Sequence, residues 1–249
     1  MTFAKKSLGQ NFLMHARIAE RIALAARLTS DSIVFEIGPG TGMLTRELLK
    51  LAKRVVALEA DGELFERLLA DFAPEIAEGR LELLYGDIRT FDPTTLPQGY
   101  ALAANIPYYL TGEIFRMFLA STNQPSRMTL LVQKEVAERI ARSKKESILS
   151  LSVKAYGEPS YEFTVPRGAF KPAPKVDSAV LTVGDISREG FATPAEEERF
   201  FALLHAGFAH KRKFVRKNLN EAGFDAGNIA EKARAEDLAL SEWLALARS

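Results

Sequence analysis

Short runs of apolar residues recur along the chain up to about residue 183, separated by longer stretches with the spacing of amphipathic helices. The short runs are rich in Val, Ile and Leu and have the length of buried strands. The predicted strands lie near 33–37, 54–58, 81–85, 100–104, 127–132, 160–165 and 178–183. Strands that alternate with helices in this way predict an α/β fold, with a parallel sheet covered by helices on both faces.

The composition changes after residue 183. Helical patterns rich in Ala, Glu, Leu and Phe run from there to the end of the chain, and Thr193-Pro194-Ala195-Glu196 is typical of a helix start with Thr193 as N-cap. We therefore expect two domains, an α/β domain over 1–183 and a small all-helical domain over 184–249. The predicted core of the helical domain consists of its large apolar residues Phe200, Leu204, Phe208 and Trp243.

Glycines and acidic residues follow three of the predicted strands. The first strand runs into Gly38-Pro39-Gly40-Thr41-Gly42 and then a helical pattern, a unit that brings backbone N–H groups and a helix N-terminus to a ligand. The spacing differs from the Gly-x-Gly-x-x-Gly of dinucleotide enzymes. Glu59 ends the second strand, where an acid can meet ribose hydroxyls, and Asp87-Ile88 follows the third, where it could hold an adenine ring. Each acid alone would also suit a solvated strand end, but together they predict a nucleoside pocket.

The segment Asn105-Ile106-Pro107-Tyr108 follows the fourth apolar run. Asn105 offers a side-chain acceptor, the carbonyl of Ile106 or Pro107 offers a second one, and the ring of Tyr108 can stack on a base. Two acceptors that hold the hydrogens of an adenine amine would turn its delocalised lone pair toward an electrophile. The alternative is an ordinary turn that ends a strand, with Pro107 fixing the backbone.

Three further segments carry a resemblance to a known family: Lys6–Leu13, Leu131–Val136 and Phe170–Val180. With the glycine loop and the Asn-Ile-Pro-Tyr segment, they make the chain similar to the S-adenosylmethionine-dependent rRNA adenine N6-dimethyltransferases, and most similar to the bacterial enzymes of the small subunit. The resemblance runs from about Lys5 to Leu219. It implies a Rossmann-like class I methyltransferase sheet of seven strands, the last one antiparallel, followed by a small C-terminal all-helical domain.

The resemblance also implies an activity and a set of site residues. The activity would be dimethylation of N6 of two adjacent adenines in the 3′-terminal hairpin loop of 16S rRNA, with a role in small-subunit biogenesis. The residues implied to bind S-adenosyl-L-methionine are Asn11, Leu13, Gly38, Gly40, Glu59, Asp87, Ile88 and Asn105. The catalytic residues implied to hold the target adenine are Asn105, Pro107, Tyr108 and Phe170, with the two rings stacking on opposite faces of the base.

Two segments depart from the family pattern. Ile148–Val153 stands where the family often shows Tyr-Gly-x-Leu-Ser-Val, and Met14-His15 stands where an acidic residue often follows. Neither change affects the residues implied in the chemistry, but both bear on how the chain contacts RNA.

The net charge of only +1 conceals two local concentrations of cations. One is the N-terminal arm with Lys5, Lys6 and Arg17, and the other is Lys211-Arg212-Lys213. Apolar residues surround the second cluster, which predicts a helix with one packed face and one basic face. Such cations would contact RNA phosphates, although charge runs are more often solvated faces.

The remaining composition argues against several classes of protein. The chain has no cysteine and only three histidines, far apart in sequence, so we expect neither disulfides nor a metal site. No apolar stretch reaches the ~20 residues that span a membrane, and the N-terminus lacks the pattern of a signal peptide. These features agree with a cytoplasmic monomer, and the resemblance implies that it acts on 16S rRNA in the small ribosomal subunit or its precursor.

Three alternatives remain at this stage. The first is a related adenine dimethyltransferase that acts on 23S rRNA, the erythromycin-resistance type, which shares the pocket motifs. The second is a ribosome-assembly factor whose binding role outweighs its methylation. The third is a nicotinamide-dependent dehydrogenase, which the glycine spacing and the Asn105–Tyr108 segment disfavour.

Overall fold

The computed structural model describes residues 9–248, so the predicted RNA contacts Lys5 and Lys6 lie outside the described residues. The chain forms two compact units. One contains the residues up to Ala137 together with Ser160–Ile186, and the other contains Glu138–Pro159 and the residues from Ser187 onward. The expected division at residue 183 differs from this grouping chiefly because Glu138–Pro159 groups with the C-terminal residues.

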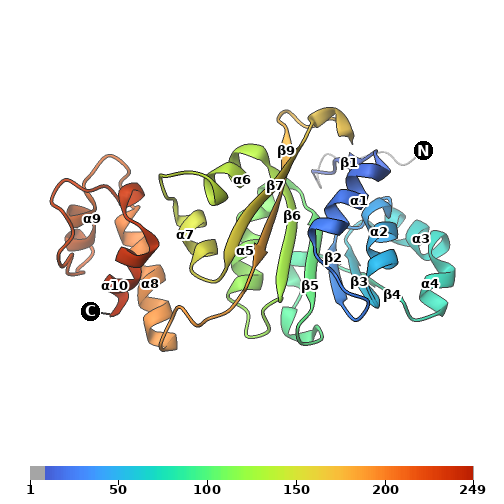
Figure 1. The fold of residues 1–249 in the computed structure, drawn as a ribbon, viewed down its shortest axis with the longest axis horizontal. Helices are drawn as coiled ribbons and strands as arrows, with labels where there is room; N and C mark the ends of the chain where they lie inside the picture. Colours follow the sequence, from blue (N-terminus) through green and yellow to red (C-terminus); the bar gives the residue numbers. More distant parts are fainter. Residues whose placement is uncertain (1–8, 249) are drawn as a thin grey trace. The chain divides into compact units, whose positions relative to one another are not determined.

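The first unit is built on a seven-stranded sheet in the order β4-β3-β2-β5-β6-β9-β7 (Figure 1). Neighbours from β4 to β6 pair in parallel, whereas β9 runs antiparallel to β6. The expected seven strands with a reversed last strand are therefore confirmed. The strands are β2 (Ile33–Ile37), β3 (Arg54–Glu59), β4 (Leu81–Tyr85), β5 (Ala101–Asn105), β6 (Arg127–Gln133), β7 (Glu158–Val165) and β9 (Ser178–Gly184).

A second, two-stranded sheet joins distant parts of the sequence. Strand β1 (Phe12–Leu13) pairs antiparallel with β8 (Phe170–Lys171), and Leu13 lies opposite Phe170. The N-terminal segment is thereby attached to the segment between β7 and β9. This attachment matters for the site, because residues next to β1 cover the end of the large sheet.

Ten α-helices and five short 3₁₀ helices occur in the described residues. The α-helices are α1 (Ala16–Ala25), α2 (Met43–Leu51), α3 (Gly62–Asp71), α4 (Ala73–Ala77), α5 (Thr111–Leu119), α6 (Lys134–Ala141), α7 (Ile148–Lys154), α8 (Pro194–Gly207), α9 (Val215–Glu221) and α10 (Leu240–Arg248). The 3₁₀ helices are η2 (Ile88–Thr90), η3 (Pro93–Thr95), η4 (Tyr108–Leu110), η5 (Arg167–Ala169) and η6 (Ala235–Asp237).

The central strands are buried on both faces, which is why they read as continuous apolar runs. Every residue of β9 is buried, as are all of β2 except Ile33. Helix α1 adds Ala19, Ile22 and Ala23 to a core cluster that includes Val34 and Leu48. The sheet is therefore a rigid support, and only the ends of its strands reach a ligand.

The C-terminal unit has the predicted helix start and the predicted core. The Thr193 hydroxyl accepts a hydrogen bond from the Glu196 N–H at 3.2 Å, and Pro194 occupies the first turn of α8. Phe200, Leu204 and Trp243 are fully buried, and Phe208 stacks on Trp243 with ring centroids 5.9 Å apart. Both predictions are confirmed.

The basic cluster Lys211-Arg212-Lys213 is not helical, so the prediction of a helix with a basic face was wrong for these three residues. Helix α8 ends at Gly207 and α9 begins only at Val215, so the cluster lies in the connecting turn. The buried Asn218 side chain donates to the carbonyl of Gly207 at 2.6 Å and to that of His210 at 3.2 Å. These two bonds hold the turn in which the cluster lies.

Candidate functional site

A pocket lies at the carboxyl ends of β2, β3 and β5. Strand β2 is the point at which the strand order changes direction, because β3 follows it on one side and β5 on the other. Open α/β sheets bind ligands at such a switch point. The pocket is lined by the glycine loop, the ends of these strands and the segment Gly9–Leu13.

The glycine loop adopts a conformation that other residues rarely reach. Gly38, Gly40 and Gly42 have φ of 66°, 60° and 75°. A Cβ on Gly42 would lie 2.5 Å from the ring of Phe72, whereas a Cβ on Gly38 would meet nothing within 4 Å. The loop is thus packed tightly against the protein at Gly42 and borders open space at Gly38, where a ligand can approach the backbone.

Glu59 connects this loop to the second strand. Its carboxylate is buried and accepts hydrogen bonds from the Gly40 N–H at 3.0 Å and the Asp61 N–H at 2.9 Å. Burial raises the pKa of Glu59, and hydrogen bonds from the backbone N–H groups of Asp61, Gly40 and Ala60 partly offset that effect. A carboxylate has about four acceptor positions, so that of Glu59 can still accept a hydroxyl of a ribose.

Glu36 is a pocket residue that the sequence interpretation missed. It lies on β2 two residues before Gly38, is 1% exposed, and one of its carboxyl oxygens has no hydrogen-bond partner in the described structure. Burial, with a smaller contribution from the charge of Glu59, raises the pKa of Glu36 to about 8. A charged residue inside the apolar run Ile33–Ile37 was the signal that could have revealed it. An unpaired polar oxygen at the pocket wall fits a ligand that carries a hydrogen-bond donor.

Asp87 and Ile88 line the pocket on the side of β4. Both oxygens of Asp87 accept hydrogen bonds from the Arg89 side chain, at 3.1 Å from Nε, and the Arg89 backbone N–H donates to one of them at 2.9 Å. These bonds hold the pKa of the Asp87 carboxyl below its usual range, so it is an ionised acceptor. Ile88 is buried and gives the pocket an apolar surface beside that acceptor.

Asn105 ends β5 and is half-buried. Its side-chain Nδ2 donates to the carbonyl of Asn11 at 3.1 Å. Because the amide nitrogen is used in this way, the orientation of the amide leaves Oδ1 as an acceptor. Asn11 also lines the pocket and donates from its side chain to the Gly9 carbonyl at 3.2 Å.

The turn after Asn105 is held by one local hydrogen bond and by one contact with β9. The Pro107 carbonyl accepts from the Leu110 N–H at 3.0 Å, which leaves it one further lone pair. The Tyr108 hydroxyl lies 2.6 Å from the Ser178 hydroxyl on β9, and burial raises the pKa of Tyr108. The phenol ring is therefore held at the pocket by a contact with a residue 70 positions later in the chain. Tyr109, which the sequence interpretation did not select, also lines the pocket and is 62% exposed.

Comparison with known proteins identifies the family. A family model described as Ribosomal RNA adenine dimethylase matches residues 1–249. The chain belongs to this family. The Ribosomal RNA small subunit methyltransferase A of Dehalococcoides mccartyi is 38% identical, over 96% of this chain and 86% of the relative. The protein of the same description from Fusobacterium nucleatum is 34% identical, over 97% of this chain and 96% of the relative.

Two solved structures resemble nearly the whole chain. The 23S rRNA methyltransferase ErmE superposes with a TM-score of 0.78 at 28% identity, covering 96% of this chain and 98% of that one. A dimethyladenosine transferase from Plasmodium falciparum superposes with a TM-score of 0.79 at 26% identity, covering 94% and 95% of the two chains. The fold is therefore that of a class I methyltransferase, and its cofactor is S-adenosylmethionine.

Within this dimethylase pocket, nearly all of the predicted cofactor and catalytic residues come together. Asn11, Leu13, Gly38, Gly40, Glu59, Asp87, Ile88, Asn105, Pro107 and Tyr108 all line it. Phe170 does not. It lies on β8, is 4% exposed, and packs in the core cluster with Leu13 and Val180. Its stacking role stays a prediction that would require the ring to leave this core.

The described members of the predicted RNA-binding set are at the surface. Arg17 is exposed on α1, and Lys211 and Arg212 are exposed in the turn after α8. Lys213 forms an ion pair with Glu221 at 3.0 Å, so part of its charge is neutralised within the protein.

No helix within residues 9–248 is long and apolar enough to cross a membrane. The same residues contain no group of three or more His, Cys, Asp or Glu side chains that could hold a metal ion. Membership of the dimethylase family excludes the nicotinamide-dependent dehydrogenase alternative.

Proposed function

We propose that this chain dimethylates N6 of two adjacent adenines in the 3′-terminal hairpin loop of 16S rRNA, with S-adenosylmethionine as methyl donor. The observation that carries the proposal is the position of Asn105, an oriented amide acceptor beside the glycine loop in a member of the rRNA adenine dimethylase family. The identity of 34–38% to small-subunit enzymes supports the choice of 16S rRNA. The expected site of action is the cytoplasm, with the enzyme acting as a monomer on the small subunit or its precursor and taking part in its biogenesis.

When bound, the cofactor supplies a methyl group that is already activated on a sulfonium. The protein then has to position the acceptor and the donor, which is the main source of acceleration for such a reaction. Glu59 would hold the ribose hydroxyls, Asp87 and Ile88 the adenine ring, and the backbone at Gly38 the methionine part of the cofactor. The unpaired oxygen of Glu36 lies on the same wall and fits a hydrogen-bond donor there.

The target adenine has to leave its stack to enter the pocket, which costs a few kcal/mol and less in a loop than in a duplex. Stacking on the ring of Tyr108 would offset about 1–3 kcal/mol of that cost. Asn105 Oδ1 and the Pro107 carbonyl would accept the two hydrogens of the amine and turn its lone pair toward the methyl group. The methylated amine is a weak base and sheds its proton to water, so no general base is required.

Methyl transfer from labelled S-adenosylmethionine to small subunits that lack the modification tests the proposal. We expect N6,N6-dimethyladenosine in the 3′ hairpin. Asn105→Ala removes the acceptor and should reduce the rate by about 10²–10³-fold, as for the loss of a donor to a transition-state oxyanion. Its midpoint of urea unfolding, compared with that of the wild type, is the control for folding. Dimethylation that persists at the wild-type rate in Asn105→Ala would refute the proposed role of this residue.

A second candidate is dimethylation of 23S rRNA. The superposition on ErmE over 96% of the chain favours it. The same assay with 23S rRNA as substrate separates the two functions, because dimethyladenosine in 23S rRNA and none in the small subunit would replace the first proposal with this one.

A further inference from the structure

The rim of the dimethylase pocket carries an exposed aromatic ring to which the proposed reaction assigns no role. The large apolar and aromatic side chains that are exposed within residues 9–248 are Met14, Leu24, Tyr85, Tyr109, Val176 and Phe214. Of these, only Tyr109 lines the pocket. Tyr109 is 62% exposed, whereas Tyr108 beside it is half-buried and bonded to Ser178. A large ring in solvent at the edge of a pocket is a surface on which a flat ligand can lie.

The two tyrosines face different ways because of the helix that carries them. They lie in η4 (Tyr108–Leu110), and a 3₁₀ helix has three residues per turn, so consecutive side chains point about 120° apart. Leu110 is buried, Tyr108 is half-buried, and Tyr109 between them is exposed. The Thr111 hydroxyl donates to the Tyr108 carbonyl at 2.9 Å and joins this turn to α5. The backbone that presents the Tyr109 ring is therefore held in place.

One edge of the Tyr109 ring packs against the N-terminal segment. A Cβ added to Gly9 would lie 3.1 Å from Cε1 and 3.5 Å from Cδ1 of the ring, so the ring lies close to the Gly9 backbone. The same segment is tied to the pocket two residues later, where the Asn11 carbonyl accepts from Asn105 at 3.1 Å. The ring is thus supported along one edge and keeps most of its surface open. A group that is ordered before binding loses less entropy when its ligand arrives.

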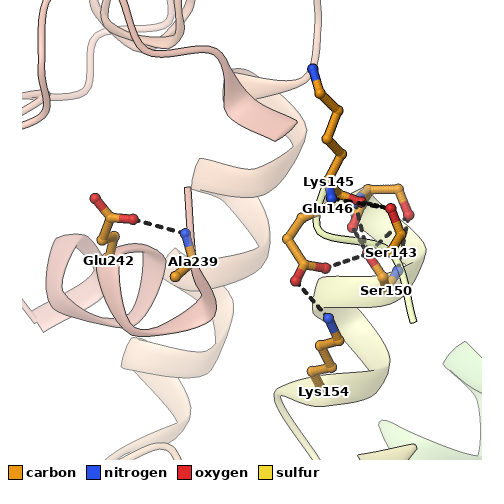
Figure 2. A network of polar contacts seen from close by, with 8 residues as sticks. Ser143, Lys145, Glu146, Ser150, Lys154, Ala239 and Glu242 are labelled. Carbon is orange, nitrogen blue, oxygen red and sulfur yellow. Dashed lines mark hydrogen bonds and ion pairs between the residues drawn. The ribbon is translucent and has the colours of Figure 1, made fainter. Parts of the chain in front are cut away.

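The loop before α7 also gathers polar side chains, but there the protein uses them itself. Figure 2 shows the Glu146 carboxylate between the Ser150 hydroxyl at 2.7 Å and the Lys154 ammonium at 2.5 Å, and Ser143 bonded to Lys145. Polar groups that are already paired gain little from a ligand, because a new bond has to replace an existing one. Tyr109 differs from this loop, since more than half of its surface is open to a ligand.

A nucleotide that enters the pocket brings its neighbour to the rim. The target base leaves its stack when it enters beside Tyr108, and the base next to it then loses a stacking partner. A single sugar–phosphate unit joins the two bases, and the Cα atoms of consecutive residues such as Tyr108 and Tyr109 are about 3.8 Å apart. The neighbouring base therefore comes close to Tyr109. Every base has a π-face that can stack on an aromatic side chain.

We propose that the Tyr109 ring stacks on the base adjacent to the target adenine, outside the pocket, while Tyr108 stacks on the target itself. The inference rests on the proposed function in that it takes rRNA as the substrate. It gives the two consecutive tyrosines separate roles. Tyr108 holds the reacting base, and Tyr109 replaces the stacking partner that the neighbouring base has lost. Tyr109 thus acts in substrate binding and not in the methyl-transfer step.

Steady-state methyl transfer to small subunits that lack the modification tests the inference. Tyr109→Ala should lower kcat/KM for the subunit roughly 5–150-fold, the range expected for the loss of one base–aromatic stack. The loss should appear mainly in KM, because the flanking stack is equally strong before and in the transition state. Tyr109→Phe keeps the ring and should recover most of the loss. Tyr109→Leu keeps apolar bulk against Gly9 without an aromatic face and should resemble Tyr109→Ala.

Tyr85→Ala is the matched control. It removes a tyrosine that is 64% exposed and does not line the pocket. Because it is a surface substitution away from the site, it should change kcat/KM less than about twofold. A loss in Tyr85→Ala as large as that in Tyr109→Ala would overturn the inference, since any exposed tyrosine would then have the same effect.

The affinity for S-adenosylmethionine, measured by calorimetry, separates the flanking base from two other roles of the Tyr109 ring. We expect similar affinities in Tyr109→Ala and the wild type. An affinity that falls as far as kcat/KM would mean that the ring contacts the cofactor or merely supports the Gly9 segment, and either result would overturn the inference. The inference would also be wrong if Tyr109→Ala methylated as well as the wild type, if its loss lay in kcat alone, or if Tyr109→Phe were equally impaired.

Methyl transfer by the wild type tests the proposed function separately. If the wild type dimethylates small subunits and Tyr109→Ala does so equally well, the function stands and the inference is wrong. If the wild type dimethylates 23S rRNA instead, the function is replaced, and the same variants assayed on 23S rRNA decide the inference. A wild type that methylates neither rRNA would overturn both.

Discussion

Glu36 carries the sharpest quantitative prediction, because a carboxyl that is 1% exposed should make the stability of the protein depend on pH. Its pKa is raised to about 8 in the folded protein, whereas in the unfolded chain it returns to about 4.5. A group whose pKa is raised on folding contributes its full stability below the unfolded pKa and loses it as pH rises toward the folded pKa. The free energy of unfolding should therefore fall between about pH 4.5 and pH 8.

The size of the effect follows from the same two values. One pKa unit corresponds to about 1.36 kcal/mol. Between pH 5 and pH 7.5 the Glu36 carboxyl is mostly ionised in the unfolded chain, while the folded protein keeps most of its proton. The loss over this interval is roughly 3 kcal/mol. The Gln side chain of Glu36→Gln is neutral in both states, so this variant should not lose stability in this way. Between pH 5 and pH 7.5 the free energy of unfolding of the wild type should therefore fall by roughly 3 kcal/mol more than that of the variant. A constant effect of the amide on stability cancels in this comparison.

Urea unfolding at pH 5 and at pH 7.5 without cofactor measures this difference. Far-UV circular dichroism is the suitable signal, because the single tryptophan, Trp243, lies in the C-terminal unit and Glu36 lies in the other. Glu66→Gln on the exposed face of α3 is the matched control. Its free energy of unfolding should change between the two pH values by the same amount as that of the wild type. If the free energy of unfolding changed equally with pH in Glu36→Gln and in the wild type, the pKa of Glu36 would not be raised in the folded protein, and the reasoning would be refuted.

Three further substitutions follow from contacts at the site and in the C-terminal unit. Glu59→Ala removes a buried acceptor of the glycine loop and should weaken cofactor binding about tenfold or more, measured by calorimetry, while RNA affinity changes little. Tyr108→Phe leaves the fully buried Ser178 hydroxyl unpaired and should cost about 1–3 kcal/mol of stability in urea, while methyl transfer persists because the ring remains. Gly207→Ala places a Cβ 2.3 Å from the Trp243 ring and should destabilise the C-terminal unit by about 1–3 kcal/mol, visible in the tryptophan fluorescence.

Each of these expectations has a result that would contradict it. Equal loss of cofactor and RNA binding in Glu59→Ala would indicate a folding defect instead of a lost ligand contact. Abolished methyl transfer in a stable Tyr108→Phe would give the hydroxyl a role beyond holding the ring. Gly112→Ala is the control for Gly207→Ala, because a Cβ on Gly112 meets nothing within 4 Å. Similar losses in both variants would mean that the crowding against Trp243 is not the cause.

The sequence by itself determined which segments form the large sheet and where the pocket lies. Each of the seven predicted strands matches an observed strand, with ends that differ by two residues at most. The central parallel strands β2, β3 and β5 are almost wholly buried, and such strands read as nearly continuous apolar runs. The pocket residues from Gly38 to Tyr108 could be found because they follow those strands directly. Residues at the carboxyl end of a central parallel strand lie at the edge of the sheet where ligands bind.

Only the tertiary structure decided which way several side chains face. Phe170 belongs to a family motif, but its antiparallel partner Leu13 lies 157 positions earlier in the chain, and this pairing turns its ring into the core. In a strand, a shift of one residue reverses the face of every side chain, so no local pattern could predict the outcome. The basic cluster lies in the turn after α8, which the Asn218 side chain on α9 holds by hydrogen bonds to the carbonyls of Gly207 and His210. The local spacing of apolar residues thus determines the helices and strands. Contacts with residues distant in the sequence determine whether a side chain faces the ligand, the core or the solvent.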